Sequence, residues 1–400
     1  MNAVRQKSIL LLLVLLAVLV TFSLHPLIVE ISRGAGILKG SILSRYIIVV
    51  FAVLFFLCFR IKETLQSSLI RTFLFMVFVV ALFSLLTFGF FEDAELFDEL
   101  RALFISWAAL VIGWQLKLSD VQFRNVILVY AISTLFVGLM QVVTNVGGFV
   151  IEEQYVTDDK NVLGVIVATS VAVFAFLAVK KNTKKTHSIL CWIIIAILFV
   201  IILTIRARTA TLVAFFIVLL ILYRRVEKSK LIIILILFPF LLVVGYFVLP
   251  SSVKEYVLSS FVLGYEGDLT SGRSARNQLA LSFLSSHPFL GNLHHEAGSI
   301  GWIHNYPLLQ LFNNGLMFGF PILTLYLYLF IKIIKNVFKC KVNSIREVGF
   351  FAMLVPYIIS LAEPTFPFGP GTATVFNFIL LGISIRYKWG SISLIENKRI

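Results

Sequence analysis

The chain has 400 residues, of which 60% are hydrophobic and only 14% are charged, and its mean hydropathy is +0.99. Soluble globular proteins carry roughly 45–50% apolar and about 25% charged residues. The composition therefore excludes a soluble protein, a disordered chain and a secreted disulfide scaffold. It predicts an all-α, polytopic integral membrane protein in which residues 1–400 form a single transmembrane domain.

The first apolar run, residues 8–24, follows Arg5 and Lys7. No Ala-x-Ala-like cleavage site follows it, so we expect a spanning helix rather than a signal peptide. A spanning helix needs about 20 apolar residues, and helical hydrogen bonding satisfies the backbone in lipid. Twelve runs are interpreted in this way: 8–24, 44–59, 69–91, 101–116, 122–144, 161–179, 188–205, 208–223, 231–249, 314–334, 347–362 and 371–386.

The net charge of +14 is distributed unevenly between the two faces that these twelve helices define. If the N-terminus is cytoplasmic, the cytoplasmic face holds 24 of the 34 basic residues and five of the 20 acidic ones. This agrees with the positive-inside rule. It predicts that both termini are cytoplasmic and that the basic excess orients the chain in the membrane. No nucleic-acid partner is expected, because no basic module with a recognisable fold is present.

The longer loops lie on the opposite, external face. The longest is the subregion 250–313, between the ninth and tenth predicted helices. Its stretch Ser274–Ser286 has a helix-like pattern, and we expect that helix to lie along the membrane surface. Long loops in compact proteins are usually functional or disordered, so this loop is the first place to look for a site.

Four arginines stand out on the external face. Arg206 and Arg208 lie in a tight turn between two apolar runs, and Arg273 and Arg276 lie at the start of the surface helix. The first two either extend to lipid phosphates and water or face a cavity, as charges at membrane depth usually do. Gly272-Arg273 sets a guanidinium beside a helix N-terminus, which suits a phosphate; the alternative is a helix cap with a solvated Arg273.

Four of the six histidines lie in the same loop: His287, His294, His295 and His304. Their spacing matches neither His-x-x-x-His nor His-Glu-x-x-His, so no metal site is predicted. His287 precedes Pro288 and is interpreted as a helix stop. His304 precedes Asn305 at the entry of a membrane segment, where a neutral imidazole can take a proton from a sugar hydroxyl. Its alternative is a loop histidine held by a backbone carbonyl.

Arginines without a compensating carboxylate cluster indicate an anionic ligand. In the external leaflet, a lipid-linked pyrophosphate is a ligand of this kind. No cofactor is implied.

With these residues in view, the chain resembles the bacterial O-antigen polymerase and O-antigen ligase family over about residues 140–390. Arg208-Thr209-Ala210 resembles the family's Ser-Arg turn, with Ala207 in place of serine. Gly272-Arg273 and His287-Pro-Phe-Leu-Gly291 resemble its Gly-Arg helix and Pro-x-x-Gly segment. Further matches are His304-Asn305 with Gly315 and Gly319, and Asn161 with Gly164.

The resemblance implies a GT-C-type glycosyltransferase of the bacterial inner membrane with a periplasmic active site. Arg208 and Arg273 would bind the pyrophosphate of an undecaprenyl-pyrophosphate-linked oligosaccharide and His304 would activate the acceptor hydroxyl, with inversion and without a metal. Arg206, Arg276, Asn305 and Asn161 are the expected substrate-binding residues. Asp158, Asp159, Glu266 and Asp268 are further candidates for contacts with sugar hydroxyls. A chain-length regulator protein would be a further partner, beside the lipid bilayer.

Several functions remain open at this point. A polymerase uses a second lipid-linked repeat unit as acceptor, whereas a ligase uses lipid A-core. The short interval from Arg273 to His304 and the segment 363–369 favour the polymerase. A flippase for the same lipid would not need His304. A secondary transporter is compatible with twelve helices and would use Glu363 for proton coupling, but the chain shows no repeat halves.

Overall fold

A computed structural model describes residues 3–34, 42–91, 95–144, 160–180, 183–226, 247, 272–293, 303–339, 344–369 and 373–396. Within these ranges the elements are helical, with no strand among them. They are α1 (Ala3–Phe22), α2 (Pro26–Gly34), α3 (Leu43–Cys58), α4 (Ile61–Thr64), α5 (Ser68–Phe91), α6 (Glu95–Gln115), α7 (Asp120–Thr144), α8 (Lys160–Ala178), α9 (Lys185–Thr204), α10 (Arg208–Arg225), α13 (Arg273–Ser286), α14 (Tyr306–Lys339), the 3₁₀ helix η3 (Ile345–Glu347), α15 (Val348–Ile359) and α16 (Val375–Glu396).

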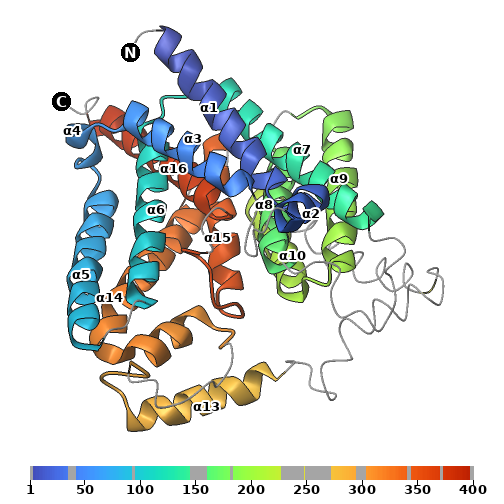
Figure 1. Cartoon of the computed structure of the whole chain (residues 1–400). Coiled ribbons are helices and arrows are strands. Elements are labelled where there is room, and N and C mark those ends of the chain that lie inside the picture. The colour runs from blue at the N-terminus through green and yellow to red at the C-terminus, as the bar shows by residue number, and fades with distance from the viewer. Residues whose placement is uncertain are drawn as a thin grey trace.

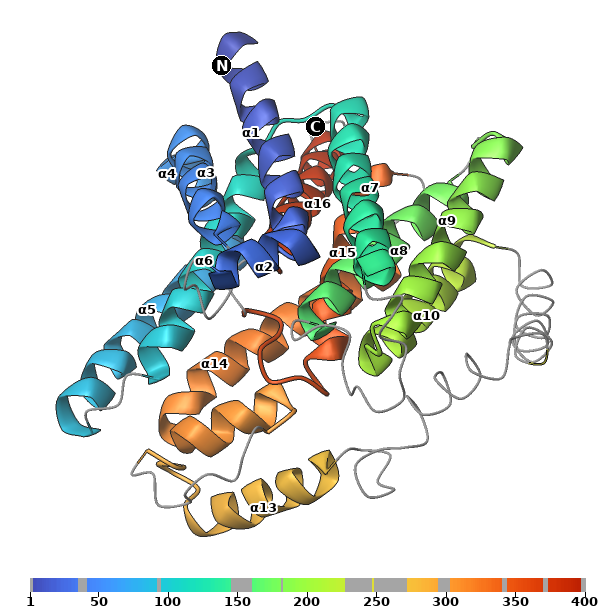
Figure 2. The same ribbon diagram turned by 45° about the vertical axis from the view of Figure 1, so that its right-hand side comes forward.

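The prediction of an all-α membrane protein agrees with this architecture. Among the described residues, six helices are long and apolar enough to cross a bilayer: α1, α5, α7, α8, α9 and α14. Eleven of the twelve predicted runs coincide with described helices, and the run 231–249, apart from Phe247, lies outside the described residues. The number of twelve spans and the GT-C arrangement remain predictions. The first residue of α1 and the last of α16 lie at the same end of the bundle, opposite α13 (Figures 1 and 2).

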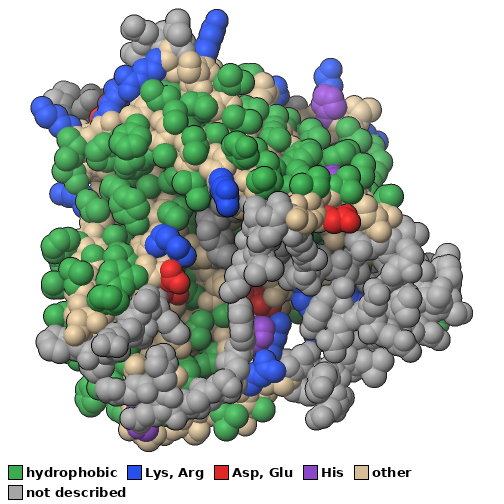
Figure 3. Space-filling view, viewed as in Figure 1, with side chains coloured by type: hydrophobic (Ala, Val, Ile, Leu, Met, Phe, Trp, Pro, Cys, Tyr) green, Lys and Arg blue, Asp and Glu red, His purple; other side chains and the backbone are tan. Residues whose placement is uncertain are grey.

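The outer surface of the bundle is apolar over much of its height. Hydrophobic side chains dominate the upper part of the face in Figure 3. Large exposed side chains include Leu11, Phe56, Phe78 and Leu212 on four different helices. Water does not tolerate so wide an apolar surface, whereas lipid does. The chain is therefore a multi-pass protein embedded in a membrane.

Helix α8 forms the centre of the bundle, and 83% of its most apolar stretch of 18 residues is buried. It packs against α7, α9, α10 and α15 (Figures 1 and 2). Its sequence is rich in Ala, Val, Ser and Thr, and such small side chains let helix backbones approach closely where lipid provides no hydrophobic driving force. Residues Leu163–Phe176 consequently lie inside the protein rather than against the bilayer.

Helices α6 and α16 pack against each other through glycines. A Cβ on Gly382 would lie 2.3 Å from the carbonyl oxygen of Leu110 and 2.7 Å from the amide nitrogen of Trp114. A Cβ on Gly113 would lie 2.0 Å from the carbonyl oxygen of Ile379. The two backbones therefore approach so closely that neither position has room for a side chain.

Helix α14 is bent at Gly315, whose φ of 61° and ψ of −172° are not helical. The short helix before the bend packs against α13 through Phe312, Ala280 and Phe283. The turn after α13 fits into the bend: the amides of Leu316 and Met317 donate to the carbonyls of Pro288 and Phe289, at 2.8 and 3.0 Å. The predicted helix Ser274–Ser286 is thus confirmed as Arg273–Ser286, and His287 ends it as predicted.

We expect Gly382→Val to destabilise the protein. The new side chain meets backbone atoms of α6 that have no free space to move into, and overpacking of this kind costs about 1–3 kcal/mol. The measurement is the thermal unfolding midpoint of the purified protein in detergent. Gly89→Ala is the matched control, because no atom lies within 4 Å of a Cβ built on Gly89; equal midpoints for the two variants would contradict the close packing.

Candidate functional site

The site is built around Glu363, in the loop that joins α15 to α16. Glu363 is only 3% exposed. The loop is anchored by the fully buried rings of Phe366 and Phe368. Phe368 packs against Phe73 of α5 and Tyr306 of α14. These rings fix the loop against the bundle, so that the carboxylate is held in a defined place.

Three polar side chains from distant parts of the sequence converge on this carboxylate. Arg273 donates from Nη2 to Oε1 at 3.0 Å, and Asn161 donates from Nδ2 to Oε2 at 2.7 Å. Nδ1 of His304 lies 3.5 Å from Oε2. Buried carboxylates need such partners, because a charge without them is costly to remove from water. The carboxylate thus joins α8, α13 and the segment before α14.

Arg273 is the first residue of α13, and the backbone places it there for a specific reason. Gly272 precedes it with a φ of +77°, a left-handed conformation that residues with a Cβ rarely adopt. Arg273 also donates from Nη1 to the carbonyl oxygen of Ala362 at 2.8 Å. Two of the five guanidinium N–H donors therefore hold the loop that carries Glu363.

The segment before α14 fixes His304. On its N-terminal side Ile303 is buried, and on its C-terminal side Asn305 caps the helix by accepting from the amide of Leu308 at 2.9 Å. Asn305 also donates from Nδ2 to the carbonyl oxygen of Leu361 at 3.1 Å. The amide of Tyr306 donates to the carbonyl of Ser360 at 2.9 Å. The first two residues after α15 thus hold Asn305 and Tyr306, directly after His304.

The first turn of α8 brings a further basic group to the site and packs against the α9–α10 turn. Lys160 interacts electrostatically with Glu363, Arg273, Arg206 and Arg208. The approach depends on a glycine four residues along α8, since a Cβ on Gly164 would lie 2.8 Å from that of Ala210 and 3.0 Å from that of Ala207. Arg206 has a φ of 55°, which turns the chain sharply between the two helices.

Among the described residues, the cluster combines four cations with one carboxylate: Lys160, Arg206, Arg208, Arg273 and Glu363. Guanidinium and ammonium groups gathered in one place suit a multiply charged anion. Basic, histidine and acidic side chains lie together in a hollow in the lower half of the face in Figure 3. Arg206 and Arg208 are half-buried, so neither is simply a solvated surface group.

A second polar group continues along the short helix after His304. The hydroxyl of Tyr306 donates to Oε2 of Glu99 at 3.1 Å, and Nε2 of Gln310 donates to Oε1 of the same glutamate at 2.7 Å. Asn314 donates from Nδ2 to Oε1 of Gln310 at 3.2 Å. This row of hydrogen bonds ties α14 to α6 and supports the helix that follows the histidine.

The structure brings together five of the seven residues that the sequence nominates: Asn161, Arg206, Arg208, Arg273 and His304. Asn305 is adjacent but serves as a helix cap. Arg276 lies one turn along α13, with its backbone amide bonded to Gly272. No described group of three His, Cys, Asp or Glu side chains is arranged to hold a metal. His294, His295, Asp158, Asp159, Glu266 and Asp268 lie outside the described residues.

One pairing is not predicted from the sequence. The sequence indicates arginines without a compensating carboxylate cluster, and in the structure a single carboxylate, Glu363, forms an ion pair with Arg273. Sequence reasoning considered Glu363 only for proton coupling in a transporter. The signal was available, because a lone carboxylate in an apolar segment of a membrane protein usually faces the interior and has a function.

Comparisons with known proteins add no assignment. A scan against protein-family models finds no match. A search among curated proteins likewise finds no significant match. The chemistry of this site is therefore inferred from its own residues.

We expect Glu363→Ala to lower the free energy of unfolding by about 3–5 kcal/mol, because removing one partner of a buried ion pair leaves the other charge uncompensated. The measurement is a denaturant unfolding curve of the purified protein. The control is Asp98→Ala, which breaks the Arg101–Asp98 pair at 3.0 Å, with side chains 72% and 76% exposed. An exposed pair contributes about 0–1 kcal/mol. Equal losses in the two variants would remove Glu363 from the centre of the site.

Proposed function

We propose that the protein is a metal-independent glycosyltransferase that polymerises undecaprenyl-pyrophosphate-linked O-antigen or capsular repeat units at the periplasmic face of a bacterial inner membrane. The observation that carries the proposal is the convergence of Arg273, Asn161 and His304 on Glu363, beside the Arg206–Arg208 turn. This arrangement combines cations for an anionic leaving group with an imidazole for a hydroxyl. The resemblance of the sequence motifs points in the same direction.

In this proposal the cations hold the pyrophosphate of the donor. Arg208 and Arg206 come from the α9–α10 turn, and Arg273 from the start of α13, where the helix dipole adds to its charge. Negative charge grows on the pyrophosphate as the glycosidic bond breaks, and fixed cations in a site with little water stabilise that charge strongly. No divalent metal is needed for this part of the reaction.

His304 activates the acceptor. If Nδ1 carries the proton and faces Glu363, Nε2 is left as the acceptor of a proton, as in other sites where a carboxylate orients a histidine. The acceptor hydroxyl oxygen then attacks the anomeric carbon and its proton passes to Nε2. The bond from that carbon to the pyrophosphate breaks, the electron pair leaves with the pyrophosphate, and the configuration inverts.

The alternatives differ in the acceptor or in the class of protein. An O-antigen ligase would carry out the same step with lipid A-core as acceptor, and the same residues would serve it. A lipid-linked oligosaccharide flippase would use the arginines but not the histidine. A proton-coupled transporter would use Glu363, whose burial is the observation in its favour.

We expect Arg208→Ala to abolish transfer and Arg208→Lys to restore part of it, because the lysine keeps a charge without the planar donor pair. The measurement is polymer formed by purified protein in vesicles from a lipid-linked repeat unit. Arg101→Ala is the control, since Arg101 is an exposed arginine with a surface partner. Near-normal polymer from Arg208→Ala would overturn the pyrophosphate assignment.

We expect His304→Ala to lower turnover by about 10²–10⁴-fold, as the loss of a general base does, while donor binding is retained. The same purified system gives the rate, and retention of labelled donor gives the binding. An equal loss of donor binding would make His304 a binding residue.

The identity of the acceptor, a lipid-linked repeat unit or lipid A-core, is tested in a strain that lacks this gene. A surface polysaccharide gel that shows one repeat unit on lipid A-core, without a ladder, indicates a polymerase. Loss of all capped core, with polymer left on undecaprenyl pyrophosphate, indicates a ligase. An unchanged ladder contradicts both and returns the transporter to consideration.

A further inference from the structure

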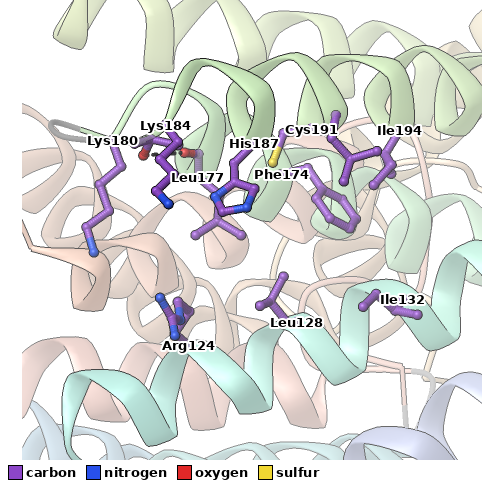
Figure 4. Close-up of a pocket in the computed structure, with 12 residues that line it drawn as sticks. Arg124, Leu128, Ile132, Phe174, Leu177, Lys180, Lys184, His187, Cys191 and Ile194 are labelled. Carbon is purple, nitrogen blue, oxygen red and sulfur yellow. Dashed lines mark hydrogen bonds between the residues drawn. The ribbon is translucent and has the colours of Figure 1, made fainter.

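A groove of about 740 Å³ opens between α7, the end of α8 and the start of α9 (Figure 4). Its volume is in the range of small-molecule sites, which is about 300–1,000 Å³. It lies far from the candidate site. Lys160 begins α8 and Lys180 follows its end, and at about 1.5 Å per residue roughly 28 Å of helix separates these ends. The groove is therefore a separate feature of the molecule.

One end of the groove is basic. Arg124 of α7, Lys180 after α8 and Lys184 before α9 gather there, with His187 beside them (Figure 4). Among the described residues that line the groove, none is acidic. Among the described residues, none of the three cations forms an ion pair with a carboxylate. Helix α7 and the α8–α9 connection therefore direct positive charge to one place, without a carboxylate partner for it among the described residues.

The other end is apolar. Leu128 and Ile132 lie on one wall, and Phe174 and Ile194 lie on the opposite one (Figure 4). The groove thus changes from charged to apolar along its length. An amphiphile with an anionic head and a hydrocarbon chain matches this order, whereas a soluble anion would leave the apolar part unfilled.

We infer that this groove binds an anionic glycerophospholipid from the surrounding leaflet. The phosphate lies between Arg124, Lys180 and Lys184, and one acyl chain lies along Leu128 and Ile132. The groove is on the face that carries the basic excess of the chain, where lipid headgroups are within reach of Lys and Arg side chains. Basic pockets between membrane helices on that face bind anionic headgroups in other membrane proteins.

The inference is independent of the proposed function, because it uses no residue of the candidate site. The bound lipid would join α7, α8 and α9 at the end of the bundle opposite the Glu363 cluster. Its role is to hold these three helices together where their own contacts leave an opening.

The test is native mass spectrometry of the purified full-length protein with dioleoyl phosphatidylglycerol, and with dioleoyl phosphatidylcholine for comparison. We expect one phosphatidylglycerol to be retained in preference to phosphatidylcholine. Arg124→Gln/Lys184→Gln is expected to weaken that binding about 30-fold, as for the loss of two basic contacts to an anionic headgroup. Lys335→Gln/Lys339→Gln removes the same charge from exposed positions of α14 and is expected to change nothing.

A third variant and a soluble probe distinguish the contribution of the lipid headgroup from that of the acyl chain. Ile132 is 54% exposed, so Ile132→Asn leaves the packing of α7 in place but makes the apolar wall polar; we expect weaker phosphatidylglycerol binding. Glycerol 3-phosphate is expected not to compete. Equal retention of the two lipids, an equal effect of the two double variants, or full competition by glycerol 3-phosphate would each overturn the inference.

Discussion

A carboxylate inside a helical membrane bundle is stable only with partners that replace water, and the arrangement around Glu363 follows from that requirement. Ionisable groups at membrane depth cost several kcal/mol when they stand alone. Glu363 finds its partners on α8, on α13 and just before α14. Because each partner lies on a different element, the carboxylate fixes the relative positions of segments that are far apart in sequence.

The sequence predicted much of the fold, for a physical reason. Lipid demands long apolar helices, so spanning segments such as α5, α7 and α9 are visible as uninterrupted hydrophobic runs. The bend at Gly315 was not predicted, because the expected span begins at residue 314 and leaves the short helix before the bend in the preceding loop. The close approach of Gly113 to Gly382 was also invisible, since a glycine in a helix does not reveal which backbone it meets.

The sequence identifies residue types of the candidate site but not their pairings. Arg206, Arg208, Arg273 and His304 are conspicuous because such groups are rare beside apolar runs. The pairing of Arg273 with Glu363 is a contact between residues 90 positions apart, and a single sequence does not show which distant residues meet in space. Lys160 follows Asp158 and Asp159 in a polar stretch of sequence, yet it begins the most buried of the six long apolar helices. Tertiary packing, not local pattern, decided both.

The 14 residues of α13 are fixed at each end, at Arg273 by Glu363 and after Ser286 by the turn that fits the bend of α14. A helix tethered in this way acts as a spacer of defined length, about 21 Å at 1.5 Å per residue. Inserting or deleting one residue would displace one end by about 1.5 Å and rotate it by about 100° relative to the other. Helix α13 is therefore a segment in which substitutions are tolerated more readily than changes of length.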